Sequence, residues 1–443
     1  MKKTPRKIAL EVLLHIHRDN GYSNLVLAGA LRQSELEERD KAFVSALVYG
    51  VLERQVTLDY VIASHTKKPL REITPEILEI IRIGAYQILF MDKVPARAAV
   101  NESVELSKRV DGGRASGFVN GILRSVERSG SVELPPEKNW ATHMGIKYAC
   151  PTWLVRLWAK SYGKETCEGI LKSLLGRPPL TVRVNTLETE RKALIQMLQK
   201  EGVSAQPHPY LRGALNLDGT GAVEKLFSYR KGYFHVQDAA SQICCGAVGA
   251  EPGETVADVC AAPGGKSFTL AQQMRNQGTL YSFDLYEQRV RLIQEGAARL
   301  HLTNLYARVR DALSPQETLS ADRILCDVPC SGFGILRRKP EIRCKQPAGL
   351  DNLPDMQYRV LCRSAESVRT GGFLIYSTCS LNPAENDAVV SRFLRENDSF
   401  RPGELVLPPG MKKGRDEPDF QITLMPHLHQ TDGFFIAVFR KVA

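Results

Sequence analysis

The chain has 443 residues, of which 43% are hydrophobic and 24% charged, and its formal net charge is +10. These are values of a globular protein, and the length exceeds what one hydrophobic core usually serves, so we expect three domains. No stretch approaches the roughly 18 uninterrupted apolar residues of a membrane helix, and the amphipathic stretch from Ile8 to Ile16 lacks a cleavage site, so we expect a soluble, cytoplasmic protein with no membrane partner.

Residues 1–140 have the pattern of an all-α domain. Thr74 is followed by Pro75, the usual order of an N-cap and a first helical residue, and a broad apolar face comes next. Asp111-Gly-Gly-Arg114 interrupts the helical pattern before another helix over residues 117–126. A stretch rich in Ser, Gly and Pro then predicts a domain boundary near residue 140.

Residues 141–235 have the pattern of a small α+β domain. We expect a mixed pattern, with helices over 152–162, 164–175 and 188–201 and strands over 180–185 and 214–217. This segment holds 14 basic and 7 acidic residues, so most of the net charge lies here. Concentrated positive charge favours a binding surface for a polyanion such as RNA, although a solvated lysine-rich surface explains the charge equally well.

Residues 236–443 alternate between strands and helices, as a doubly wound parallel sheet requires. The predicted parallel strands cover residues 255–259, 280–283, 305–309, 323–326 and 373–376. The apolar run over 433–439 predicts a further strand that pairs antiparallel with 421–424, and residues 401–419 have the composition of a flexible loop. The expected fold class is therefore α/β with a Rossmann-like third domain.

A turn of small residues, Cys260-Ala-Ala-Pro-Gly-Gly-Lys266, joins the first of these strands to a helix. Small residues let a ligand approach the backbone, and the N-terminus of the helix offers free amides. A phosphate-binding loop would need glycine where Cys260 stands, which disfavours an ATPase, and the dinucleotide fingerprint Gly-x-Gly-x-x-Gly is absent. The turn therefore predicts a different nucleotide-like cofactor.

Three aspartates, Asp284, Asp311 and Asp327, follow successive predicted strands. A carboxylate at the end of the second strand can accept hydrogen bonds from ribose hydroxyls, which favours a nucleoside. Asp311 could address the base, and Asp327 a cationic group. The set suits S-adenosylmethionine, whose amine and sulfonium are positive, whereas helix capping is the simpler explanation for each aspartate taken alone.

Two of the ten cysteines, Cys330 and Cys379, each follow an apolar strand and have Pro, Ser, Thr or Gly as neighbours, which does not suit a packed core. We interpret them as a nucleophile and an assisting group, and the motifs alone do not say which cysteine has which role. The ten show neither disulfide-framework spacing nor a Cys-x-x-Cys pair, so we expect free thiols and no metal. Six are expected to be small buried hydrophobes: Cys150, Cys167, Cys244, Cys245, Cys326 and Cys362.

The motifs Asp258–Lys266, Asp327–Gly332 and Ser377–Pro383 resemble those of the S-adenosylmethionine-dependent RNA cytosine-5 methyltransferases of the NOL1/NOP2/Sun family. The helical N-terminus resembles the antitermination factor NusB, so the resemblance covers nearly the whole chain. It implies a NusB-like RNA-binding domain over 1–140, a small RNA-binding domain over 141–235 and a Rossmann-like methyltransferase domain over 236–443.

The resemblance also implies roles for individual residues. Cys379 would be the nucleophile that attacks carbon 6 of cytosine, Cys330 would serve product release, and Asp327 could protonate nitrogen 3 of the ring. The residues expected to hold S-adenosylmethionine are Cys260, Ala261, Ala262, Pro263, Gly264, Gly265, Lys266, Asp284, Asp311 and Asp327.

The resemblance implies small-subunit (16S) ribosomal RNA as the substrate, naked or within an assembling particle, and we expect a monomer. Transfer RNA is the main alternative substrate, and a noncatalytic RNA-binding or ribosome-assembly factor is an alternative from another class. Arg337-Arg338-Lys339 is a candidate to bind phosphates beside the target base, although a solvated run of surface charge explains these residues equally well. The chain departs from the common pattern at Arg310, Cys344 and Ala384, which bears on substrate fit more than on chemistry.

Overall fold

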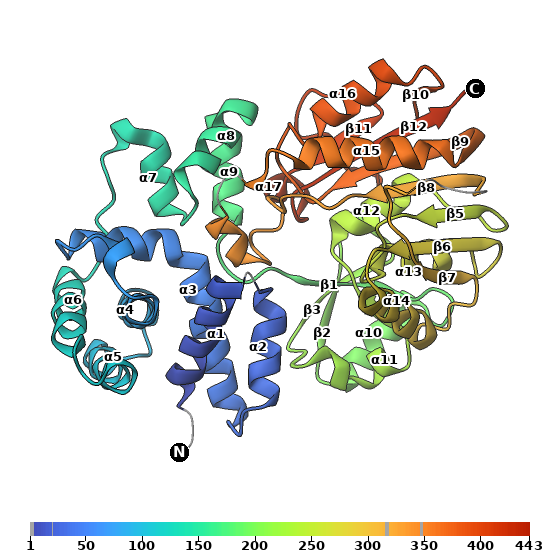
Figure 1. Cartoon of the computed structure of the whole chain (residues 1–443). Coiled ribbons are helices and arrows are strands. Elements are labelled where there is room, and N and C mark those ends of the chain that lie inside the picture. The colour runs from blue at the N-terminus through green and yellow to red at the C-terminus, as the bar shows by residue number, and fades with distance from the viewer. Residues whose placement is uncertain (1–3, 20, 315–318, 346–348) are drawn as a thin grey trace. The chain divides into compact units, whose positions relative to one another are not determined.

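The computed structural model describes residues 4–19, 21–314, 319–345 and 349–443. The chain forms two compact units, one made of residues 1–177 with 336–345 and the other of residues 178–335 with 346–443 (Figure 1). The chain therefore passes between the units three times. The three-domain division predicted from the sequence stays a prediction.

The described part of the first unit is helical throughout. Its helices are α1 (Pro5–Asp19), α2 (Ser23–Arg32), α3 (Glu38–Ser64), α4 (Pro75–Phe90), α5 (Ala96–Asp111), α6 (Ser116–Ser129), α7 (Trp140–Lys147), α8 (Thr152–Tyr162) and α9 (Lys164–Ser173). Apolar residues at helical spacing, such as Ile77, Ile80 and Ile81 of α4, are buried in its core. Thr74 holds the N-cap position before α4, as predicted, but its side chain makes no capping hydrogen bond.

A short segment from the second half of the sequence, Leu336–Lys345, belongs to this helical unit. Its 3-10 turn (Pro340–Cys344) carries the buried Arg343, whose guanidinium donates to the carbonyls of Glu53, Ala149 and Leu174 over 2.6 to 2.9 Å. These bonds fasten the segment to the helical unit, because a buried carbonyl left without a donor is costly.

Other residues of the Leu336–Lys345 segment are held in the same way. Arg337 donates to the carbonyls of Gly176 and Arg177, and Lys339 lies over the ring of Tyr22. The Arg337 guanidinium is thus bonded within the protein, and its predicted part in phosphate binding stays a prediction.

The second unit begins with a small antiparallel sheet in the order β2-β3-β1-β4. Its elements are β1 (Leu180–Val184), α10 (Arg191–Lys200), β2 (Ser204–Pro207), β3 (Ala214–Asp218), α11 (Phe227–Arg230) and β4 (Phe234–Val236). The sequence analysis found β1, α10 and β3 but missed β2 and β4, which are short and carry Pro or His instead of an alternating apolar pattern.

The larger sheet has eight strands in the order β10-β12-β9-β8-β5-β6-β7, with β11 also paired to β12. Its strands are β5 (Thr255–Asp258), β6 (Thr279–Asp284), β7 (Leu305–Val309), β8 (Ala321–Asp327), β9 (Val368–Thr378), β10 (Phe400–Pro402), β11 (Gln421–Leu424) and β12 (Phe434–Lys441). Strands β5 to β9 are parallel neighbours, and β12 runs antiparallel to β9 and to β11. The predicted pairing of the closing strand with 421–424 is confirmed.

Helices cover both faces of this sheet (Figure 1). They are α12 (Ala239–Val248), α13 (Gly265–Gln273), α14 (Glu287–Arg299), α15 (Leu353–Glu366), α16 (Asp387–Glu396) and the short α17 (Pro426–His429). Alternate residues of one strand serve opposite faces: Leu325 packs in the cluster of α12, α13 and α14, whereas Ile324 and Cys326 pack in the cluster of α15 and α16. The predicted α/β fold class with an all-α N-terminal part is confirmed.

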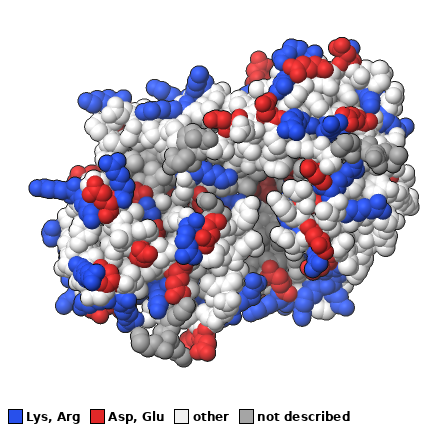
Figure 2. All heavy atoms as spheres, in the orientation of Figure 1, with Lys and Arg blue, Asp and Glu red and all other residues white. Residues whose placement is uncertain are grey.

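The basic residues of the segment 141–235 are divided between the two units. Exposed lysines and arginines lie on the helical unit, among them Lys147, Arg156 and Lys160, and on the second unit, among them Lys192 and Arg212. On the face drawn in Figure 2, basic and acidic side chains are interspersed. Among the described residues, no helix combines the length and apolar character needed to cross a membrane.

Candidate active site

The residues singled out by sequence gather where the parallel strands of the larger sheet end. Asp258, Asp284 and Asp327 are the last residues of β5, β6 and β8, and Thr378 is the last residue of β9. The strand order reverses beside β5, since the chain runs outward to β6 and β7 and then returns to β8 on the other side. Such a switch point is where open α/β sheets bind ligands.

The turn Cys260–Lys266 lies directly after β5 and leads into α13, which begins at Gly265. Gly264 has φ of 109°, and a Cβ there would stand 2.4 Å from Cζ of Phe268, so only glycine fits. Burial raises the pKa of the Cys260 thiol well above its ordinary value, so this thiol stays neutral. The turn is thus a close-packed backbone element that leads into a helix N-terminus.

Lys266 and Asp327 form an ion pair across this edge, with Nζ 2.7 Å from Oδ2. The other carboxylate oxygen of Asp327 accepts from the hydroxyl of Ser377 over 2.8 Å. Burial by itself would lower the pKa of Lys266, but the attraction of Asp327 and the nearby thiols outweighs it and the pKa is raised. Lys266 therefore stays charged, and it links the turn Cys260–Lys266 to the strand end that precedes Cys330.

Asp258, which the sequence analysis quoted only as part of a motif, is a buried carboxyl in this cluster. Its Oδ2 accepts from Ser267 over 2.8 Å, while its Oδ1 has no hydrogen-bond partner among the described residues. Burial raises the pKa of Asp258 to about 7. Its position at the end of a predicted strand, before a turn with two glycines, could have marked Asp258 as a site residue.

Asp284 and Asp311 also make local contacts that hold the backbone. The buried Asp284 accepts from the amides of Ala262 and Tyr286 over 3.3 Å and pairs with Arg289. Asp284 therefore ties the turn Cys260–Lys266 to the end of β6. Asp311 is exposed and accepts from the amide of Leu313 over 2.8 Å, so it stabilises its own turn.

Cys330 and Cys379 lie in contact, with their sulfur atoms 2.8 Å apart. They come from the loops after β8 and β9, which are neighbouring parallel strands, and both are half-buried free thiols. The hydrogen bond to Cys379, together with burial, raises the pKa of Cys330 well above its ordinary value. The Cys330 thiol is therefore neutral at pH 7.

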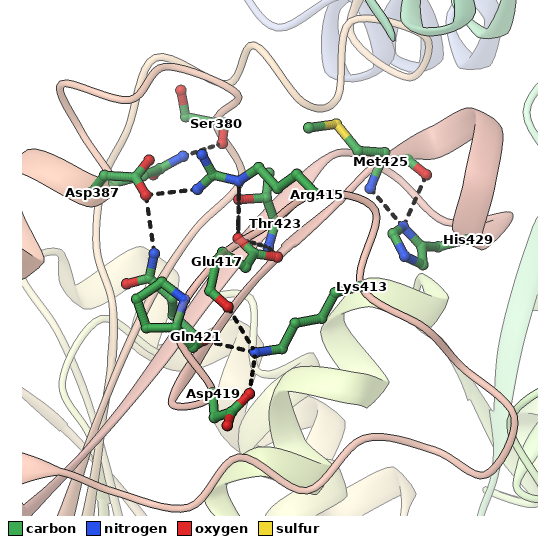
Figure 3. Close-up of polar contacts among 12 residues, drawn as sticks. Ser380, Asp387, Lys413, Arg415, Glu417, Asp419, Gln421, Thr423, Met425 and His429 are labelled. Atoms are coloured by element: carbon green, nitrogen blue, oxygen red, sulfur yellow. Dashed lines mark hydrogen bonds and ion pairs between the residues drawn. The ribbon is translucent and has the colours of Figure 1, made fainter. Parts of the chain in front are cut away.

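A third loop packs beside the Cys379 loop through a polar cluster (Figure 3). Arg415 donates to Asp387 at the start of α16 and to Glu417, and Glu417 accepts from the amide and hydroxyl of Thr423. Lys413 donates to Asp419 and to the carbonyls of Glu417 and Pro418. The segment predicted to be a flexible loop is therefore anchored at several points, although it forms no helix or strand between 403 and 420.

No group of three or more possible metal ligands is found among the described residues. No prediction from the sequence covers Glu385 and Asn386, which lie beside the cysteine loops. Both are buried and bonded to the Cys379 loop. The only sign of Glu385 in the sequence is a charged residue two positions after Pro383 and close to the start of α16.

Three family models match successive parts of the chain. The NusB family matches residues 3–128, the ferredoxin-like domain of RsmF/B-like methyltransferases matches 150–224, and the model described as 16S rRNA methyltransferase RsmB/F matches 247–440.

Known proteins resemble the chain over most of its length. A protein of Bacillus subtilis described as probable ribosomal RNA small subunit methyltransferase B is 37% identical over 454 residues, which covers all of both chains. The solved structure of a methyltransferase homolog from Pyrococcus horikoshii is 29% identical and has a TM-score of 0.60, over 70% of this chain and all of that one. The structure of NSun6 from the same organism with SFG, at 24% identity and a TM-score of 0.61, covers 66% of this chain and 98% of its own and shares the fold.

Proposed function

Because the chain belongs to the ribosomal RNA small subunit methyltransferase B family, we propose that it transfers a methyl group from S-adenosylmethionine to carbon 5 of a cytidine in 16S ribosomal RNA. The observation that carries the chemistry is the contact between the thiols of Cys330 and Cys379, 2.8 Å apart at the ligand edge of the sheet. Two thiols in contact at such an edge suit covalent catalysis better than core packing.

The residues of this edge fit the proposed cofactor. Asp284 supplies a buried carboxylate at the end of β6, the position from which ribose hydroxyls are bound in this class of fold, and Asp327 supplies a second negative group. The residues from Cys260 to Lys266 would bind the cofactor through their backbone groups, and Asp311 would reach the base of the cofactor. When bound, the cofactor supplies an activated methyl group on a positively charged sulfur.

Cys379 is the proposed nucleophile. Carbon 5 of cytosine is too weak a nucleophile while the ring is aromatic, and a thiolate adding at carbon 6 makes carbon 5 enamine-like. Since Cys330 keeps its proton, it can donate a hydrogen bond to the sulfur of Cys379, and a hydrogen bond to a thiolate stabilises the charged form.

Cys330 is proposed to serve product release. After methylation the proton on carbon 5 leaves to a base, the electrons of that C–H bond restore the ring, and the bond from carbon 6 to sulfur breaks with its electrons returning to Cys379. The hydrogen bond from Cys330 favours this departure because it stabilises the leaving thiolate. Asp327 is proposed to address nitrogen 3 of the ring, with Lys266 holding the carboxylate in place.

The target base must leave its stack to reach these thiols, so a loop or unpaired cytidine is the proposed substrate, in naked RNA or in an assembling particle. The relatives described as ribosomal RNA methyltransferases favour ribosomal over transfer RNA. We further propose that the protein acts as a monomer.

The test is to incubate the wild type, Cys330→Ala and Cys379→Ala with S-adenosylmethionine and unmodified 16S RNA and to look for a protein–RNA adduct on a denaturing gel. An adduct that accumulates only with Cys330→Ala supports both cysteine roles. If neither variant traps RNA although the wild type methylates it, the two-cysteine assignment is wrong. Transfer RNA serves as the competing substrate.

A further inference from the structure

One buried carboxylate, that of Glu385, joins the two loops that carry the cysteines. It accepts from the amide and the hydroxyl of Ser331 over 2.8 and 2.6 Å, and from the hydroxyl of Ser380 over 2.8 Å. Ser331 directly follows Cys330, and Ser380 directly follows Cys379. The same side chain thus holds the residue after each thiol.

Two further donors complete the shell of Glu385. Gln357 on α15 donates to Oε2 over 3.0 Å and Asn382 donates to Oε1 over 3.1 Å. The amide of Gln357 also donates to the carbonyl of Pro329, the residue before Cys330, over 3.0 Å. Five hydrogen bonds therefore converge on a carboxylate that is 1% exposed, which meets the requirement that a buried charge be fully hydrogen-bonded.

The neighbouring Asn386 holds the Cys379 loop through two hydrogen bonds. Its amide donates to the carbonyl of Ser380 over 2.8 Å, and its carbonyl oxygen accepts from the hydroxyl of Thr378 over 2.6 Å. The main-chain carbonyl of Glu385 accepts from the hydroxyl of Tyr376 over 2.6 Å. Glu385 is thus itself held rigidly, so it can set the separation of the two loops.

We propose that Glu385 is a positioning residue that holds the thiols of Cys330 and Cys379 in contact, an inference that rests on the proposed function for its catalytic consequence. The thiols are half-buried, whereas Ser331 and Ser380 have no exposed surface. The loops are therefore fixed at their bases and present the sulfur atoms at the surface of the site. Loss of the shared acceptor would remove the bonds that both loops make to one carboxylate. It would leave the direct contact of the Ser331 and Ser380 hydroxyls, 2.8 Å apart, and the bond from the Gly334 amide to the Cys379 carbonyl, so we expect the loops to be held less firmly.

The decisive variant is Glu385→Gln, which keeps the size but turns one acceptor oxygen into an NH2 group that faces donors. Its matched control is Glu417→Gln, because Glu417 is also buried and accepts several hydrogen bonds in the same unit, but in the cluster of Figure 3 and not between the cysteine loops. Both variants lose a buried carboxylate, and only the first loses the carboxylate that bridges Ser331 and Ser380, whose hydroxyls also contact each other directly.

The first readout is the rate at which diamide links Cys330 to Cys379 as a disulfide, followed by mass spectrometry of the joined peptides. This rate reports the contact of the thiols whether or not the RNA chemistry is as proposed. We expect Glu385→Gln to slow the linkage about tenfold and Glu417→Gln to leave it within about twofold of wild type. Equal rates in wild type and Glu385→Gln would overturn the proposal.

The second readout is turnover with 16S RNA. We expect Glu385→Gln to lower kcat about tenfold or more, to leave the KM for S-adenosylmethionine within about twofold, and to accumulate some protein–RNA adduct because release is slowed. An equal loss in both variants would show a general effect on stability and would overturn the positioning role. If Cys330→Ala traps no RNA while wild type is active, the proposed role of Cys330 in release fails, and the diamide rates still decide the role of Glu385.

If Glu385→Gln does not fold, Ser331→Ala and Ser380→Ala replace it. Each removes one donor to Glu385 without burying a new polar group, and each is expected to slow the diamide linkage about threefold or more. Linkage rates equal to wild type in both serine variants would overturn the proposal.

Discussion

The ammonium of Lys266 lies 2.7 Å from the carboxylate of Asp327. This ion pair joins the turn Cys260–Lys266 to the end of β8. The side chains are 13% and 25% exposed, so both charges are largely removed from water. Removing one partner of such a pair lowers the stability of the fold, because the other charge is then buried and uncompensated. The pair therefore couples the geometry of the turn to that of the loop with Cys330.

Lys266→Met is expected to destabilise the second unit by about 3 kcal/mol, near the lower end for a broken buried pair because Asp327 keeps some contact with water. Adding Asp327→Asn should recover part of this loss, since the uncompensated charge is then removed. A double-mutant cycle on the free energy of unfolding measures the coupling, expected at about 1 to 3 kcal/mol. Additive single effects would show that the two side chains do not interact.

Cys379→Ala is expected to abolish methyl transfer while the affinity for S-adenosylmethionine stays near wild type. The reason is that the proposed cofactor residues lie in the turn after β5 and at the ends of β6 and β8, whereas Cys379 follows β9. Isothermal titration with the cofactor and methylation of 16S RNA measure the two quantities separately. Residual methylation by Cys379→Ala would remove it from the role of nucleophile.

Asp258 predicts a pH dependence of stability. Its pKa in the fold is about 7 against an ordinary 3.8, so between these values the folded state holds a proton that the unfolded state has released. Stability from this group is therefore fully present below about pH 4 and falls as the pH rises to about 7, by at most about 4 kcal/mol. Asp258→Asn, which mimics the protonated form, should flatten this part of the profile in melting followed by circular dichroism. A profile as steep as that of wild type would contradict the assignment.

The sequence singled out the two thiols of this site but not the residues that hold their loops. Cys330 and Cys379 stood out because their polar and small neighbours do not suit a core, and the parallel order of their strands placed them on one edge. Glu385 carried no such signal, because its partner Ser331 lies 54 positions earlier and its partner Ser380, five positions earlier, is a short polar residue of a common type.

The path of the chain between the units was equally hidden from sequence. The basic triplet beginning at Arg337 follows the Cys330 loop closely, so it suggested phosphate binding, whereas Arg337 is bonded to carbonyls near residue 176. Local patterns predict elements well because propensity and spacing are local quantities. They cannot show that a ten-residue segment leaves one unit to pack in the other, since that depends on carbonyls far away in the sequence.

Arg343 should be the residue on which that packing depends most. It is 3% exposed and donates to the carbonyls of Glu53, Ala149 and Leu174, so Arg343→Ala removes three hydrogen bonds, of which those to Ala149 and Leu174 are buried. We expect a loss of about 3 kcal/mol or more in the stability of the helical unit. Arg337→Ala is the matched control, because Arg337 also donates to two carbonyls but is exposed to water, which can replace it at a cost of about 1 kcal/mol or less.

All three tryptophans of the chain, Trp140, Trp153 and Trp158, lie in the helical unit. Their fluorescence therefore reports the unfolding of that unit separately from the second. Arg343→Ala should shift the fluorescence midpoint in guanidinium to a lower concentration, Arg343→Lys should recover only part of the shift because an ammonium cannot reach all three carbonyls, and Arg337→Ala should leave the midpoint nearly unchanged. An unchanged midpoint in Arg343→Ala would mean that the Leu336–Lys345 segment is held by its apolar contacts and not by the guanidinium.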